Sequence, residues 1–188
     1  MGVEERMADR CNTIRLYSFQ TDVVYQVLKR DGVCYSKEEY VRKKYKESAK
    51  VFINAYGWFV KEAQHIVPKP EGAEYPYWAF TDLYNVDQTG DGHVLTLDVP
   101  IGEAILFDMF DWTKIMQMHY IGENESEEAT FSEELKNMGM NEFQIMTSNF
   151  YPEQKARIQE SWKRLFGHQQ AIEAGDNSGV HSVQAGLW

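Results

Sequence analysis

The chain has 188 residues, of which 43% are hydrophobic and 14% aromatic, and its formal net charge is −10. This length fits one domain, and the apolar content is enough to form a core, which excludes wholesale disorder. The negative charge removes the global positive field that holds a nucleic-acid backbone, so nucleic acid is not favoured as a partner. The basic residues clustered between positions 42 and 50 still leave a local contact open.

Cysteine usage and hydropathy are typical of a cytoplasmic protein. The two cysteines, Cys11 and Cys34, form neither a disulfide framework nor a metal-binding spacing. No apolar run approaches the roughly 20 residues of a membrane helix, and residues 1–12 are too charged for a secretory signal. We therefore expect a cytoplasmic protein without a membrane partner, a loose lead-in over residues 1–12, and a single domain over residues 13–188.

The first predicted strand covers Thr13–Phe19, because its side chains alternate in polarity and it is rich in β-formers. One side of this strand has the composition of a core, and the other side carries an arginine between aromatic residues. The first side holds Ile14, Leu16 and Ser18, and the second holds Arg15, Tyr17 and Phe19.

Helical patterns follow this strand. A short helix is predicted over Val23–Lys29, ended by a left-handed Gly32, and a short second strand over Val33–Tyr35. The segment SKEE, which begins at Ser36, has the form of a capping box. Apolar residues at three- and four-residue steps then predict a helical region to about Ile66.

The second half of the chain mixes short strands with helices. The expected elements are the extended segment Tyr75–Phe80, strands over Val94–Val99 and Ala104–Phe107, a helix over Trp112–Met118 capped by Asp108 or Asp111, a weak helix within Glu123–Glu134, a helix over Glu153–Phe166 and a closing strand over Val180–Trp188. Because strands and helices do not alternate strictly, we predict an α+β fold: a single domain of small, mostly antiparallel sheets packed with several helices.

The segment Asp87–Asp98 imitates a calcium-binding loop. Oxygen donors occupy its first, third and fifth positions, and a glycine occupies the sixth. Leu95 at the ninth position, and a strand rather than a helix after the loop, favour a plain hairpin or loop turn. The five histidines show no metal-ligand spacing, so no metal is expected.

Arg15 is the most informative polar residue, because a buried arginine needs a partner. One interpretation is a buried ion pair, with Asp108 or Glu160 as the partner. The other is an anion or phosphate clamp, for which the guanidinium fork is well suited. Aromatic residues could line a pocket that stacks a flat ring, or they could form the core. They are Tyr17, Tyr56, Trp58, Tyr77, Trp78 and Trp112.

Seven separated segments occur in one order that resembles an uncharacterised bacterial family, domain of unknown function 3841. They are IRLYSFQTDVVYQVLKRDGVCY, AYGWFV, YPYWAF, VLTLDVP, FDMFDW, ESWKRLF and VQAGLW. The resemblance extends from about Ile14 to Trp188, and it implies no particular activity.

The arginine-bearing strand, the short helix and the Gly32-Val33 turn are also similar in layout to the ADP-ribosyltransferase-like fold. That resemblance implies NAD as a cofactor, with Arg15 at a phosphate, and Glu160 or Gln184 near the ribose. It also implies that Tyr17, Tyr56 and Trp78 bind the cofactor by shaping the ring pocket.

The sequence departs from that fold in two ways. It has no serine-threonine-serine strand, and the late strand offers Gln184 with no glutamate after it before Trp188. A catalytic carboxylate would therefore come from elsewhere, or the chain is trimmed, or it is not such an enzyme. The alternative function is a non-catalytic binding module, whose partner is a protein or a small aromatic ligand.

Overall fold

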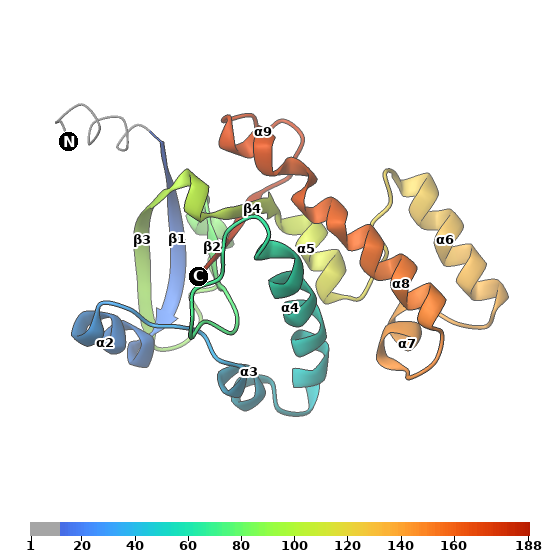
Figure 1. Ribbon diagram of the computed structural model, residues 1–188, viewed down its shortest axis with the longest axis horizontal. Coiled ribbons are helices and arrows are strands. Elements are labelled where there is room, and N and C mark those ends of the chain that lie inside the picture. The colour runs from blue at the N-terminus through green and yellow to red at the C-terminus, as the bar shows by residue number, and fades with distance from the viewer. Residues whose placement is uncertain (1–11) are drawn as a thin grey trace.

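Five strands form one antiparallel sheet in the order β3-β1-β2-β5-β4. The structure is a computed structural model that describes residues 12–188, so Cys11 and nearly all of the predicted lead-in lie outside the described residues. The strands are β1 Thr13–Thr21, β2 Tyr77–Phe80, β3 Gly92–Pro100, β4 Ile105–Asp108 and β5 Val183–Leu187 (Figure 1). An α+β fold with an antiparallel sheet is confirmed.

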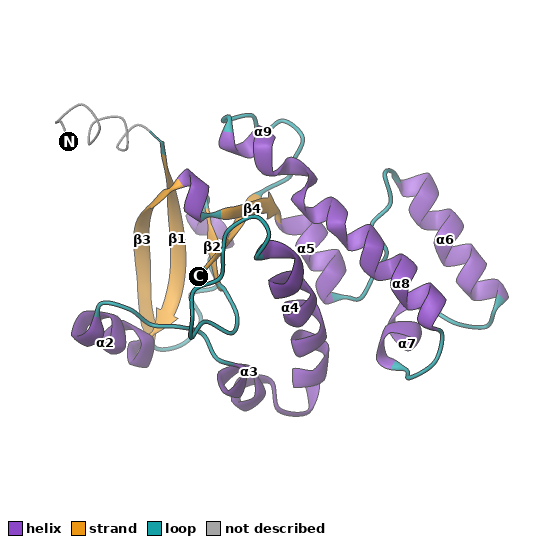
Figure 2. Cartoon of the chain, in the orientation of Figure 1, coloured by secondary structure: helices purple, strands orange, loops and turns teal. Residues whose placement is uncertain are grey.

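Helices lie mainly to one side of this sheet along the long axis of the molecule (Figure 2). They are α2 Asp22–Asp31, α3 Glu38–Tyr45, α4 Ala49–Ala63, α5 Met109–Met116, α6 Glu125–Asn137, α7 Glu142–Thr147, α8 Pro152–Ser161 and α9 Gln169–Glu173, with a 3₁₀ segment over Trp162–His168 between the last two. β1 and β3 form a long ribbon at one end of the molecule, whereas α6 and α8 lie toward the other end (Figure 1).

The two faces of the sheet pack against different cores, because side chains alternate across each strand. One face contacts the larger core through Trp78 and Phe107, which pack on Phe59 of α4. The opposite face carries a smaller core that includes Leu16 and Ile172. The predicted alternation of β1 is therefore confirmed, with Leu16 and Ser18 on a buried side.

The free edge of β4 is closed by a side chain. Gln169 accepts a hydrogen bond from Leu106 N at 2.5 Å and donates one to Ala104 O at 3.0 Å. The carboxamide thus satisfies the backbone as a neighbouring strand would, which protects an edge that could otherwise pair with another chain.

The predicted capping box and the strand after α2 are wrong. Ser36 forms an isolated bridge with Tyr75 instead of capping a helix, and Val33–Tyr35 is not a strand. Lys37 is the N-cap, and Glu38 N donates to the carboxylate of Glu74. A partner distant in sequence therefore satisfies an amide of the first turn of α3, in place of a local cap.

The long helical region is also interrupted. Lys46 adopts a positive φ of 50°, and a short 3₁₀ turn separates α3 from α4. The helix over 112–118 begins earlier than predicted, at Met109, because Asp108 caps it by accepting from Phe110 N. The closing strand is confirmed as β5.

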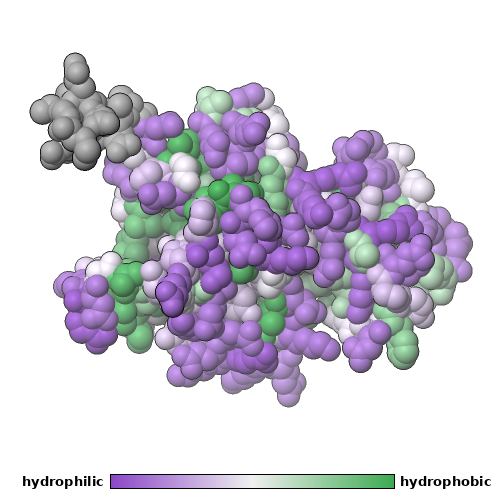
Figure 3. Space-filling view, in the orientation of Figure 1, coloured by the Kyte–Doolittle hydropathy of each residue, from purple (hydrophilic) through white to green (hydrophobic). Residues whose placement is uncertain are grey.

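Surface hydropathy differs between the two ends of the molecule. The face in Figure 3 is mostly hydrophilic over α6 and α8, and its hydrophobic patches lie largely over the sheet. Within residues 12–188, no helix combines the length and the apolar character needed to cross a bilayer.

Candidate functional site

Arg15 lies on the solvent-exposed part of the sheet. Its guanidinium forms a two-bond pair with the carboxylate of Asp98, at 2.8 and 3.0 Å, and the two side chains are 62% and 55% exposed. The expected buried pair with Asp108 or Glu160 is therefore wrong. The strand register places Asp98 directly opposite Arg15, and this ribbon is too exposed to bury either charge.

The register places four of the predicted site residues on one face of the sheet. Tyr17 is opposite Phe80, and Phe80 is opposite Gln184. Directly opposed residues share a face, as do residues two apart on one strand. Arg15, Tyr17, Trp78 and Gln184 therefore project from the same side, which is the side that α4 covers in part.

Tyr56 joins this group from α4. Its hydroxyl accepts a hydrogen bond from Trp78 Nε1 at 3.2 Å, and the two rings meet edge to face with centroids 5.3 Å apart. Burial is the main reason that the pKa of Tyr56 is raised above its ordinary value. The hydroxyl therefore stays protonated and acts as a fixed polar group in an aromatic cluster.

Gln184 is the buried polar residue of this face. It is 3% exposed, and its neighbours across the sheet are Phe80 and Phe107. Within residues 12–188, no fully buried side-chain nitrogen or oxygen lacks a hydrogen-bond partner, so Gln184 is not an unsatisfied group. A carboxamide carries both donors and an acceptor, so this side chain is chemically able to bind a polar ligand atom.

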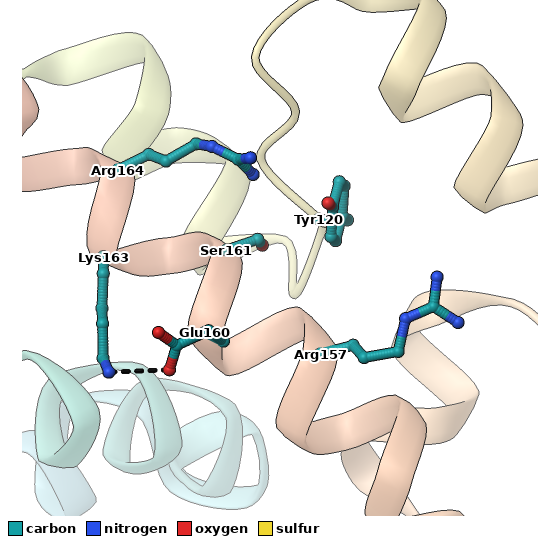
Figure 4. A pocket seen from close by; sticks show the side chains of 6 residues that line it. All are labelled: Tyr120, Arg157, Glu160, Ser161, Lys163 and Arg164. Carbon is teal, nitrogen blue, oxygen red and sulfur yellow. Dashed lines mark ion pairs between the residues drawn. The ribbon is translucent and has the colours of Figure 1, made fainter.

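Glu160 lies apart from these residues, on α8. It pairs with Lys163 at 2.7 Å and lines a shallow pocket of about 560 Å³. Figure 4 shows its carboxylate turned toward Lys163, while Arg157 extends to the other side. α4 and α5 lie between α8 and β1 (Figure 1), so the structure does not bring Glu160 together with Arg15.

The cations of this pocket also have partners. Arg157 forms a two-bond pair with Glu134, and Arg164 donates to Ile121 O at 2.7 Å. An incoming anion would have to compete with these contacts and with the net charge of −10. The pocket is consequently a weaker candidate than the sheet face.

A carboxylate–histidine pair at the end of the sheet was missed from the sequence. Asp108 is 3% exposed and accepts from His181 Nδ1 at 2.8 Å, as well as from the amides of Phe110 and His181. This geometry leaves His181 Nε2 free, on a largely exposed ring that stacks on Phe110. The two residues are 73 positions apart, so no local spacing could reveal the pair.

Hydrogen bonding sets the ionisation of Asp108. Burial alone would raise its pKa, but the bonds from His181, Phe110 and Ser182 together hold the pKa below its ordinary value. Nearby Asp111 behaves in the opposite way, because burial raises its pKa above the ordinary value. The attraction to Lys114, 4.0 Å away, acts against this rise but does not cancel it.

The calcium-like segment is divided between a turn and a strand. Asp87 accepts from Thr89 N at 3.0 Å, which closes a local turn. β3 begins at Gly92, and Asp98 faces Arg15 across the ribbon. Within residues 12–188, no group of three or more His, Cys, Asp or Glu side chains is arranged to hold a metal ion.

A family model for a domain of unknown function, DUF3841, matches residues 15–188. The chain belongs to this family. The match spans β1 to β5 and therefore includes the sheet face and the Asp108–His181 pair. Neither the curated proteins nor the solved structures yield a match. The description of DUF3841 assigns no activity.

Proposed function

We propose that this DUF3841 domain binds a nucleotide of the NAD type on the sheet face that carries Arg15, Tyr17, Trp78 and Gln184. The observation that carries the proposal is the strand register, which brings these four residues to one side from three strands. Arg15 and Gln184 lie near opposite ends of the chain, so only the pairing of the strands brings them to the same face.

Each residue has a chemical reason to contact such a ligand. The pair between Arg15 and Asp98 is exposed, and pairs of this kind contribute little stability, so a phosphate can compete for the guanidinium. Tyr17 and Trp78 offer flat apolar surfaces for a ring. Gln184 offers both a donor and an acceptor for a ribose hydroxyl or a carboxamide.

The spacing also suits a nucleotide. Tyr17 and Gln184 are separated by one intervening strand, which places their backbones about 10 Å apart. When bound, NAD would supply a ribosyl group whose transfer requires a nearby carboxylate in the transition state. Glu160 lies on α8, away from this face, so the proposal is of binding, in an ADP-ribosyltransferase-like arrangement, rather than of a defined transfer step.

The proposal is tested by calorimetry and thermal shift with NAD, ADP-ribose and nicotinamide. We expect NAD to raise the melting temperature of the unsubstituted chain, and Arg15→Gln to weaken NAD binding about tenfold or more. Arg30→Gln is the matched control, because Arg30 forms a similarly exposed two-bond pair with Asp31, on α2. Absence of any NAD effect, or equal effects of the two substitutions, would contradict the proposal.

A second candidate function, a binding module for a protein partner, is favoured by a different surface. Asn85 donates to Ser182 at 2.6 Å, which places the turn 83–85 beside residues 181–182. Phe110, in the first turn of α5, stacks on the ring of His181. Leu83, Tyr84 and Phe110 are 44%, 93% and 50% exposed, an unusual density of apolar side chains around one imidazole.

Photo-crosslinking in cells tests this second candidate. A photoreactive residue at Tyr84 should trap a discrete partner, whereas the same residue at Tyr40, which is exposed on α3, should not. Equal labelling from both positions would indicate non-specific contact and would remove this candidate.

A further inference from the structure

The outer edge of β3 has no strand beside it in the described part of the chain. β3 has nine residues and pairs on one side with β1, while its other side is the end of the sheet. At the opposite end, the Gln169 carboxamide covers the edge of β4. Within residues 12–188 the fold therefore covers one edge and leaves the longer one without a partner strand, while α2 contacts the start of β3 through Asp22 and Tyr25 against His93.

One hydrogen bond fixes which backbone groups of β3 face outward. Ile101 N donates to Asn12 O at 2.9 Å, which continues the β1–β3 register by one pair. Bonded and non-bonded pairs alternate in an antiparallel ladder, so the odd-numbered residues of β3 bond to β1. The amides and carbonyls of Val94, Thr96 and Asp98 consequently point away from β1.

The sequence of β3 does little to protect this edge. Proline occurs at its end, as Pro100, its one carboxylate, Asp98, is paired with Arg15 of β1, and the strand contains no lysine. Leu95, Leu97 and Val99 form a half-buried apolar row on one face. Natural edge strands are usually blunted by charge, proline, a bulge or a covering segment, and a long regular edge is a template for another strand.

We propose that two copies of this chain associate through β3, paired antiparallel about a two-fold axis at Thr96. Thr96 is the midpoint of Gly92–Pro100, so this register alone overlaps the full length of both strands. It places Leu95 opposite Leu97 of the second copy, which covers apolar surface on both chains.

The charges of β3 agree with this register. Asp98 lies opposite Val94 of the second copy, so no like charges meet, whereas an axis at Asp98 would oppose two carboxylates. Identical patches related by a two-fold axis are the usual route to homodimers. The net charge of −10 on each copy opposes association, so the dimer should be strengthened by salt.

Analytical ultracentrifugation of the full chain over a wide concentration range tests the proposal. We expect a reversible dimer that Thr96→Pro weakens about tenfold or more, because proline removes the central outward donor without disturbing the ladder to β1. Thr96→Val keeps that donor and should leave the dimer intact. Thr96→Asp keeps the backbone and sets two carboxylates opposite each other, so it should weaken the dimer even if the proline variant misfolds.

Cysteine crosslinking tests the register. Under mild oxidation, Thr96→Cys should give a disulfide-linked dimer, because that position faces itself across the axis. Val94→Cys should crosslink poorly by itself and well in combination with Asp98→Cys. The unsubstituted chain, with Cys11 and Cys34, gives the background. A monomer at all concentrations, a dimer unaffected by Thr96→Pro and Thr96→Asp, or equal crosslinking from positions 94 and 96 would overturn the proposal.

Discussion

Asp108 shows how one buried carboxylate can hold three segments together. It ends β4, caps α5 through Phe110 N, and accepts the amides of His181 and Ser182 just before β5. Each of these bonds is charge-assisted, and such bonds are about twice as strong as neutral ones. The same residue thereby fixes a helix terminus, a strand terminus and the orientation of an exposed imidazole.

The substitution Asp108→Asn should destabilise the chain at neutral pH by about 2–3 kcal/mol, because the amide loses the charge and one acceptor position. The folded pKa of Asp108 lies below its unfolded value of about 3.9, so its contribution is present above that pH and is lost as the pH falls through the folded value. Urea unfolding should therefore show a gap between the two proteins at pH 7 that narrows below about pH 4.

Asp176→Asn is the control for this measurement. Asp176 also accepts a backbone amide, from Ser178, but it is exposed. We expect it to change the free energy of unfolding by less than about 1 kcal/mol. Equal losses for Asp108→Asn and Asp176→Asn would show that burial and multiple bonds at Asp108 contribute nothing.

Asp111 should show the opposite pH dependence. Burial raises its folded pKa above the unfolded value, so its carboxylate opposes folding once it ionises. The penalty is absent below the unfolded pKa and grows as the pH rises toward the folded one. Asp111→Asn should therefore stabilise the chain at pH 7 and have little effect near pH 3, as measured by urea unfolding. Destabilisation at pH 7 would mean that the attraction to Lys114 outweighs burial.

At the scale of elements, the strands were more predictable than the helix boundaries. Alternation over Thr13–Phe19 and Val94–Val99 located β1 and β3, because each has one half-buried face. The helix starts depended on distant groups. Glu74 satisfies the first amide of α3, and Asn124 and Asn141 cap α6 and α7. The second of these forms a capping box that is visible in the sequence but was not recognised.

The candidate site was predictable only in part, for a related reason. Residue chemistry identified Arg15, Tyr17, Trp78 and Gln184 individually, but their common face depends on the order β1-β2-β5 and on the register between strands. Pairing between strands far apart in sequence leaves no local pattern. The Asp108–His181 pair was missed for the same reason.

The closure of the β4 edge by Gln169 can be tested at this scale. Gln169→Leu should cost about 2–4 kcal/mol, because Leu106 N and Ala104 O are buried and both lose their partner. Gln170→Leu is the matched control, since the side chain of Gln170 is exposed and does not contact the edge of β4. Chemical denaturation of both variants measures the difference, and equal stabilities would show that the β4 edge needs no cover.

At the scale of the whole molecule, negative charges outnumber positive ones. The chain carries 29 acidic and 19 basic residues, and exposed pairs such as Arg15–Asp98 and Lys163–Glu160 contribute little individually. We therefore expect long-range repulsion between carboxylates to outweigh the sum of local attractions. Helix α6 is an example of closely spaced carboxylates, with Glu125, Glu127 and Glu128 in its first turn.

Sodium chloride should accordingly raise the melting temperature at pH 7, because screening weakens repulsion more than it weakens exposed pairs. For a chain of this size, a gain of about 1 kcal/mol corresponds to roughly 2–4 °C. The chloride salt is needed because sulfate would also strengthen apolar burial. Low protein concentration keeps dimerisation out of the measurement. The increase should shrink near pH 5, where protonation reduces the net charge. A melting temperature that falls with chloride at pH 7 would show instead that the ion pairs dominate.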